Sequence, residues 1–210
     1  MKLSGLDASD VQVHEQANVY SGFLKLFKYT ITHGLFKGGV SHPLIREATV
    51  RPPSVGVILF DPVHDQVVMV EQFRMGPFLS NEDPWLLEVV AGISEPGETL
   101  EEVARREVEE ETGYQITSLI PLSDVYLSPG ASNEKLKLFC GLVDATDAGG
   151  IFGVADEGED IRVHVLSFLE AYDMVKDGRI ANAPAVIALQ WLKLHHHELC
   201  QHEKLCQYEK

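Results

Sequence analysis

Residues 92–114 read GISEPGETLEEVARREVEEETGY, a stretch that predicts an acidic helix with defined ends. Thr99 is followed three residues later by Glu102. This spacing is typical of a capping box, in which the two side chains satisfy backbone N–H groups at the start of a helix. Gly113 supplies the left-handed residue that commonly ends a helix. We therefore expect the helix to start at the Thr99 box and to end at Gly113.

The predicted helix places two glutamates on its apolar side. At ~100° per residue, Leu100, Val103 and Ala104 cluster on one face, and Glu107 and Glu111 fall in the middle of it. Two ionised carboxylates one turn apart against apolar neighbours repel each other and lose hydration, which is costly unless a cation compensates. Carboxylate oxygens suit Mg²⁺, which binds one or two carboxylates together with substrate phosphates. The sequence of this helix therefore predicts a magnesium-binding site, in which Mn²⁺ could substitute for Mg²⁺.

A solvated acidic face is the alternative interpretation of this helix. It accounts for Arg106 and Glu110, which are four residues apart and can form an ion pair on the helix surface. It does not account for Glu107 and Glu111, because solvated glutamates belong on the side opposite Leu100.

The composition limits the classes of function. The chain has 210 residues, 45% of them hydrophobic, which is enough for a substantial core in one or two domains. Seventeen Lys and Arg residues against 32 Asp and Glu residues give a formal net charge of -15. Nucleic-acid backbones and anionic membranes both require a basic surface, so neither is an expected partner. A small anionic substrate would need a bound metal and a few arginines.

The cysteines and the hydropathy pattern indicate the compartment. Cys140, Cys200 and Cys206 are odd in number and scattered along the chain. We find no signal-peptide pattern and no apolar run of ~18 residues. We therefore expect a reduced, cytoplasmic setting.

Residues 1–52 form a β-rich segment that differs from the rest of the chain. Alternation and β-branched residues predict three strands, at 11–13, 23–32 and 41–50. So few strands with so little sequence between them can hardly build an independent core. We expect this N-terminal β subdomain to pack on a partner subunit.

Residues 53–210 predict a layered α+β domain. A buried hairpin is expected at 55–60 and 66–74, and one apolar strand at 84–92 leads directly into the acidic helix. Further strands are expected at 116–127, 136–143 and 161–166, with helices at 167–176 and 184–204. Proline and glycine predict a loop at 128–134. Residues 149–160 predict a flexible acidic segment, for which a solvated turn is an equal alternative.

The second of these helices ends in six potential zinc ligands. They are His195, His196, His197, Cys200, His202 and Cys206. Their spacing fits no compact tetrahedral pattern, so we favour a polar helix end over a zinc site.

The acidic helix also carries a resemblance to a known family. Gly92, Glu98, the pairs at 106–107 and 110–111, and Gly113 fill every fixed position of the Nudix box, the signature of hydrolases that cleave nucleoside diphosphates linked to another group. So many spaced positions make the motif specific. The resemblance implies a Nudix α/β/α sandwich with a mixed sheet at 53–210, preceded by the small β subdomain at 1–52.

The likeness extends over nearly the whole chain. The proline in Ser128-Pro129-Gly130 resembles the proline that is characteristic of the ADP-ribose pyrophosphatase branch. Residues 85–92, 155–165 and 186–196 also closely resemble sequences of that branch. The resemblance implies Mg²⁺-dependent hydrolysis of ADP-ribose, and of other ADP-sugars if specificity is broad, to AMP and a sugar phosphate.

The resemblance also assigns metal and catalytic roles. The metal ligands would be Glu107, Glu111, Glu159 and the backbone carbonyl of Ala91. Glu157 would be the general base that takes a proton from the attacking water. Arg106 would orient the helix carboxylates, Glu110 would orient them or bind metal, and Glu98 would hold the loop that precedes the helix.

Substrate-binding positions follow in the same way. They are Phe23, Arg46, Arg51, Arg74, Ser128 and Glu134. An aromatic ring and a guanidinium can sandwich an adenine, and arginine pairs well with phosphate. Without the resemblance, Phe23 could be a core residue and the arginines could be solvated. The relatives are homodimers whose N-terminal strands cross a two-fold axis, so each site would borrow residues from its neighbour.

Two alternative functions stay open. One is a Nudix pyrophosphatase for another substrate, such as a nucleotide sugar like GDP-mannose, or NADH. The other is a catalytically silent Nudix domain that senses ADP-ribose, although an intact box argues against it.

Overall fold

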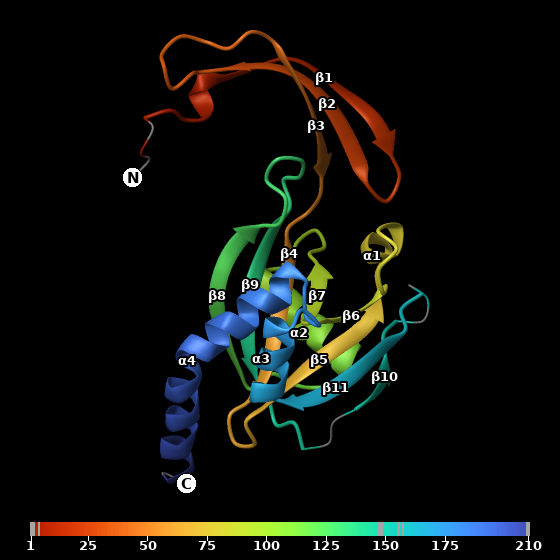
Figure 1. The fold of residues 1–210 in the computed structure, drawn as a ribbon, viewed down its shortest axis with the longest axis vertical. Coiled ribbons are helices and arrows are strands. Elements are labelled where there is room, and N and C mark those ends of the chain that lie inside the picture. Colours follow the sequence, from red (N-terminus) through yellow and green to blue (C-terminus); the bar gives the residue numbers. More distant parts are fainter. Residues whose placement is uncertain (1–2, 4, 147–148, 155, 157, 209–210) are drawn as a thin grey trace. The chain divides into compact units, whose positions relative to one another are not determined.

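The computed structural model describes residues 3, 5–146, 149–154, 156 and 158–208, with side chains described as far as residue 201 (Figure 1). The chain divides into two compact units. The first comprises residues 1–52 and 126–134, and the second comprises residues 53–125 and 135–210.

The first unit is a three-stranded antiparallel sheet in the order β1-β2-β3. A short 3₁₀ helix at Ala8–Asp10 leads into β1 (Val11–Ser21), β2 (Lys25–His33) and β3 (Leu44–Val50). The three predicted strands are therefore confirmed, and β1 is longer than predicted. Every residue of β1 is exposed, so this sheet has no core on that strand.

The loop at 128–134 belongs to the first unit and hydrogen-bonds to the backbone at the end of β3 and just after it. The Thr49 N–H donates to the Ala131 carbonyl over 2.8 Å. The Arg51 N–H donates to Asn133 Oδ1, also over 2.8 Å. The predicted loop thus continues the edge of the sheet beyond β3.

The second unit is built on a mixed eight-stranded sheet. The central strand β4 (Ser54–Asp61) pairs in parallel with β9 (Lys135–Leu142) and antiparallel with β5 (Gln66–Phe73). The order along the sheet is β10-β11-β5-β4-β9-β8, with β11 at Ile161–Ser167 and β8 at Ser118–Tyr126. All eight residues of β4 are buried, in agreement with the apolar run at 55–60.

Helices cover both faces of this sheet. Alternate residues of β4 and β5 enter two separate clusters, because successive side chains of a strand point to opposite faces. One cluster includes α2 (Leu100–Thr112) and the other includes α3 (Phe168–Lys176) and α4 (Ala183–Tyr208), which lie together on the near face in Figure 1. The predicted α+β sandwich with a mixed sheet is confirmed.

The single strand predicted at 84–92 is wrong. The chain forms two strands, β6 (Trp85–Glu88) and β7 (Val90–Ile93), separated by Val89. β6 pairs with β5, whereas β7 pairs with the first half of β4. Because β5 pairs with β4 only from Leu59 onward, the chain must change partners at Val89.

Two further elements of the second unit were not predicted. A short helix, α1 (Met75–Leu79), follows β5, and a short strand, β10 (Gly150–Phe152), lies within residues 149–160, which were predicted to be a flexible acidic segment or a solvated turn. β10 pairs antiparallel with β11 at the sheet edge. Within the described part of the chain, every helix is too short or too polar to traverse a lipid bilayer.

Candidate active site

Helix α2 has the ends that its sequence predicts. The Thr99 side chain accepts a hydrogen bond from the Glu102 N–H, and the Glu102 carboxylate accepts one from the Thr99 N–H over 2.8 Å. Gly113 closes the helix with φ of 72°. These caps fix the register of the helix on the sheet, and with it the direction of its glutamates.

Glu107 and Glu111 point toward the sheet, as predicted. Glu111 is only 2% exposed and lies beside the backbone of β7, where the Ala91 N–H donates to its Oε2 over 3.4 Å. Burial, with a further contribution from Glu107, raises the pKa of Glu111 to about 8. Burial raises the pKa of Glu107 to about 7, although the Arg106 guanidinium acts in the opposite direction. In the absence of a cation, the pair is therefore held partly protonated near neutral pH.

Arg106 joins three acidic side chains of the helix and the preceding loop. Its Nε donates to Glu98 Oε1 over 2.9 Å, and its Nη1 donates to Glu107 Oε1 over 2.9 Å and to Glu110 Oε2 over 3.0 Å. Hydrogen bonds from Arg106 lower the pKa of Glu98, which also accepts the Glu95 N–H. With these hydrogen bonds, Arg106 can orient the Glu107 carboxylate, and Glu98 can hold the loop that precedes the helix.

Glu159 approaches the two helix carboxylates from the segment that follows β10. Its charge raises the pKa values of both Glu107 and Glu111, so the three carboxylates share one region. The Val154 N–H donates to Glu159 Oε2 over 3.0 Å and restrains the side chain. Glu157, the predicted general base, lies outside the described residues.

The end of β5 contributes a cationic and an amide group on the same side of the sheet. Arg74 Nε donates to Glu88 Oε2 over 2.6 Å, and the charge of Arg74 lowers the pKa of Glu111. Gln72 is 9% exposed, and its Nε2 has no hydrogen-bond partner among the described residues. The sequence analysis missed Gln72, although strand alternation from Val70 would have placed it on the face covered by α2.

These residues fit a divalent cation. Three carboxylates and a strand backbone converge where burial raises the pKa values of Glu107 and Glu111 and so disfavours their charged forms. An all-oxygen donor set of this kind suits hard cations such as Mg²⁺ or Mn²⁺. A bound cation would offset the repulsion among the carboxylates of Glu107, Glu111 and Glu159.

Comparison with known proteins decides the family. Residues 50–190 match the NUDIX domain. The sequence is 47% identical to the ADP-ribose pyrophosphatase of Escherichia coli strain K12 over 191 residues, covering 91% of each chain. The chain belongs to the NUDIX family. The carboxylates of α2 are those of its Nudix box.

Other Nudix proteins are similar at lower identity. The ADP-ribose pyrophosphatase of Haemophilus influenzae is 43% identical over 195 residues, covering 91% of this chain and 90% of the relative. The GDP-mannose pyrophosphatase of Yersinia enterocolitica is 35% identical over 178 residues, covering 82% and 90%. A crystal structure of an ADP compounds hydrolase shares the fold with a TM-score of 0.67 at 20% identity, covering 88% of this chain and 95% of that one.

The first unit of this Nudix protein brings together several of the predicted substrate-binding residues. The Arg51 guanidinium lies 5.4 Å from the centre of the Phe23 ring, and its Nε lies 3.6 Å from Glu134 Oε2. The Ser128 carbonyl accepts the N–H groups of two later residues in the same loop and so shapes it. Arg46 is exposed on β3, where its Nη1 donates to the Ile45 carbonyl. Phe23 is 86% exposed and is therefore not a core residue in this unit.

Proposed function

We propose that this chain hydrolyses the pyrophosphate of ADP-ribose to AMP and ribose 5-phosphate, with Mg²⁺ as the metal ion. The pair of buried Glu111 and half-buried Glu107 carries the proposal, because burial makes two carboxylates one helical turn apart costly unless they bind a cation. The ADP-ribose pyrophosphatases that share 47% and 43% identity with the chain support the choice of substrate.

Glu107, Glu111, Glu159 and the Ala91 carbonyl would hold the metal. When bound, a divalent cation there supplies positive charge that offsets the negative charge of the pyrophosphate oxygens. Arg106 keeps the Glu107 carboxylate directed at the site through its 2.9 Å contact. The four ligands have only oxygen donors, which favours magnesium over a softer ion.

The remaining steps belong to side chains of the protein. Glu157 would accept a proton from the attacking water. The oxygen of that water forms a bond to phosphorus while the bond between phosphorus and the bridging oxygen breaks. Arg74, beside Glu88 and on the same side of the sheet as the acidic helix, would pair with a phosphate oxygen. The unpartnered Gln72 amide offers a further donor on that face.

We place recognition of the adenosine part on the first unit. Phe23 presents an exposed ring, and Arg51 lies over it at 5.4 Å. Ring and guanidinium together can stack on an adenine, while Glu134 restrains Arg51. Arg46 and Ser128 complete the proposed set.

The exposed first sheet supports a homodimer. β1 exposes large apolar side chains at Val11, Val13, Val19 and Tyr20. A second copy of the chain would cover them by exchange of the N-terminal β subdomain at 1–52. Sedimentation velocity over a range of concentrations tests this, since a monomer at every concentration would exclude the exchanged dimer.

A substrate panel tests the function. The purified chain is incubated with Mg²⁺ and with ADP-ribose, an ADP-sugar, GDP-mannose or NADH, and nucleoside monophosphate release is measured. We expect the highest kcat/KM with ADP-ribose, a large loss in Glu111→Gln, and little change in Glu109→Gln, which alters an exposed glutamate of the same helix.

Two results would replace the proposal. Preferred hydrolysis of GDP-mannose would favour the second candidate, which the 35% identical GDP-mannose pyrophosphatase supports. Tight ADP-ribose binding without turnover in either Mg²⁺ or Mn²⁺ would indicate a sensor instead.

A further inference from the structure

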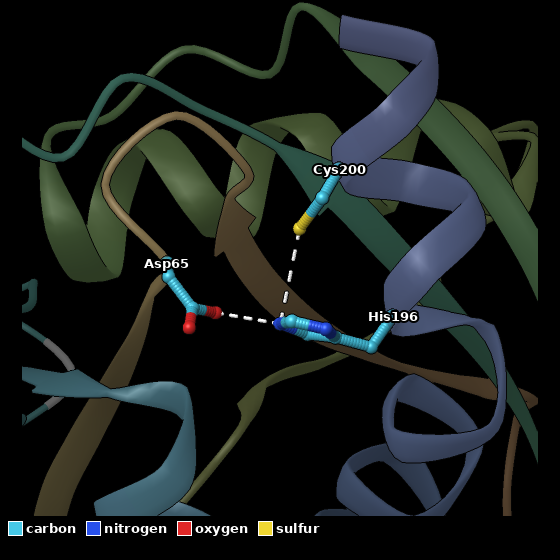
Figure 2. A group of neighbouring side chains, drawn as sticks. All are labelled: Asp65, His196 and Cys200. Atoms are coloured by element: carbon cyan, nitrogen blue, oxygen red, sulfur yellow. Dashed lines mark hydrogen bonds and ion pairs between the residues drawn. The ribbon is translucent and has the colours of Figure 1, made fainter. Parts of the chain in front are cut away.

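Three metal-ligating side chains converge on the side of the sheet opposite the acidic helix. Asp65 lies in the turn between β4 and β5, and His196 and Cys200 lie one turn apart on α4 (Figure 2). His196 Nε2 is 2.6 Å from Asp65 Oδ1 and 3.8 Å from Cys200 Sγ. All three ligand atoms lie within 4.8 Å of one another.

Both neighbours approach the same ring nitrogen. An imidazole Nε2 offers either one N–H or one lone pair. With the proton, Nε2 donates to Asp65. With the lone pair, Nε2 accepts from the thiol and faces the Asp65 carboxylate with no proton between them. A cation at this position would instead accept an electron pair from Nε2, from the Asp65 oxygen and from the Cys200 sulfur.

The fold holds the three groups in place. The His196 ring stacks on the Phe168 ring, with centroids 4.6 Å apart and planes 20° apart, and it also contacts Phe60. The Phe168 N–H donates to the Asp65 carbonyl over 3.0 Å, which anchors the turn to the start of α3. The helix brings Cys200 to the same side as His196, because residues four apart lie on one face. The ligands are therefore largely preorganised.

The donor set selects a class of metal. One imidazole nitrogen, one thiolate sulfur and one carboxylate oxygen suit a borderline ion such as Zn²⁺ rather than Mg²⁺. Tetrahedral zinc would separate its ligand atoms by about 3.3 to 3.7 Å. The Nε2–Oδ1 distance of 2.6 Å is shorter than this and the Nε2–Sγ distance of 3.8 Å is slightly longer, so the Asp65 carboxylate, which is 55% exposed, would shift when the metal binds.

We propose that Asp65, His196 and Cys200 bind a borderline divalent transition-metal ion, with Zn²⁺ preferred and solvent in the fourth position. Binding converts the Cys200 thiol to a thiolate and releases its proton to solvent. The ion would fasten α4 to the turn between β4 and β5. This site differs in ligands and in face from the acidic site on α2. The sequence alone did not predict it, because Asp65 is 131 residues from His196.

Cobalt substitution tests the site through its sulfur ligand. Co²⁺ is titrated into the full chain after chelator treatment, and the thiolate-to-cobalt charge-transfer band is followed. An oxygen-only site gives no such band, so cobalt bound at α2 does not interfere. We expect one equivalent of Co²⁺ to produce the band, Zn²⁺ to abolish it, and excess Mg²⁺ to leave it unchanged.

Variants assign the ligands. Cys200→Ser should remove the band, and Asp65→Asn and His196→Gln should weaken Co²⁺ binding by at least about 10-fold. His197→Gln is the matched control, because His197 pairs with Gln201 and not with the cluster. Cys206→Ser controls for the other thiol late in the chain. A band that survives Cys200→Ser or disappears in Cys206→Ser would overturn the proposal, as would a wild-type chain that produces no band.

Discussion

The backbone of Gly92 lies directly against the carboxylate of Glu107, and a Cβ atom at position 92 would overlap that carboxylate. Gly92 is in β7, at the point where the sheet passes under α2. Glu107 can therefore occupy its position only because residue 92 has no side chain.

Replacing Gly92 with alanine should reduce activity more than stability. The added methyl group meets the end of a flexible side chain, so Glu107 moves while the strand stays in place. We expect kcat for ADP-ribose to fall by about 10²-fold, since small misplacements of a catalytic group can cost that much. Steady-state kinetics and thermal unfolding check this. Gly76→Ala, where a Cβ meets open space, is the matched control, and equal kinetics in the two variants would contradict the prediction.

Arg106→Ala should weaken metal activation. The change removes the guanidinium that directs Glu107, Glu98 and Glu110, and leaves three acids repelling one another. We expect the Mg²⁺ concentration for half-maximal activity to rise by about 10-fold or more. Arg105→Ala serves as the control, because Arg105 donates to the Ile116 carbonyl instead. The same Mg²⁺ dependence in both variants would rule out the orienting role.

The metal-free protein should lose stability as pH rises from about 5 to 8. Burial raises the pKa values of Glu107 and Glu111 from 4.5 to about 7 and about 8, so between these limits the folded state binds more protons than the unfolded state. The two protonated glutamates therefore contribute their full stabilisation below the ordinary pKa of 4.5. This stabilisation is lost as the pH rises through their pKa values in the folded state. Thermal unfolding in a chelator checks this. Glu111→Gln should flatten the profile and raise Tm at pH 8, and an unchanged slope would count against it.

Glu157→Gln should slow catalysis without loss of substrate binding. Removing general-base assistance typically lowers the rate by ~10²- to 10⁴-fold. We expect kcat to fall by that factor while the Kd for ADP-ribose stays similar by calorimetry. Asp160→Asn, a nearby change of an exposed acid, should keep most activity. A fall in binding with unchanged kcat would remove Glu157 from the role of base.

Phe23→Ala should raise KM for ADP-ribose with little change in kcat. The exposed ring below Arg51 would lose its stacking on adenine, an interaction of about 1 kcal/mol or roughly 5- to 10-fold in affinity. Phe36→Ala, which removes another exposed ring of the same unit, is the control. Equal KM values in the two variants would exclude adenine recognition by Phe23.

The sequence predicts the acidic helix well because its signals are local. Thr99 and Glu102 begin α2, Gly113 ends it, and the 3.6-residue period places Glu107 and Glu111 toward the sheet. Each of these features depends on residues within one or two turns.

The features that the sequence does not predict depend on distant partners. The break at Val89 follows from the place where β5 leaves β4, which no local propensity encodes. The cluster of Asp65 with α4 forms only when a turn and a helix from opposite ends of the second unit meet. The unpartnered amide of Gln72 is likewise visible only when its neighbours are in place.

The complete burial of β4 has a consequence for how the second unit opens. Val55, Val57 and Leu59 pack in the cluster with α2, Ile58 and Phe60 pack in the cluster with α3 and α4, and the strand hydrogen-bonds to β5, β7 and β9. No layer can separate from the sheet without exposing this strand. Its amide protons should therefore exchange with deuterated solvent only through global unfolding, and should be among the slowest in the chain.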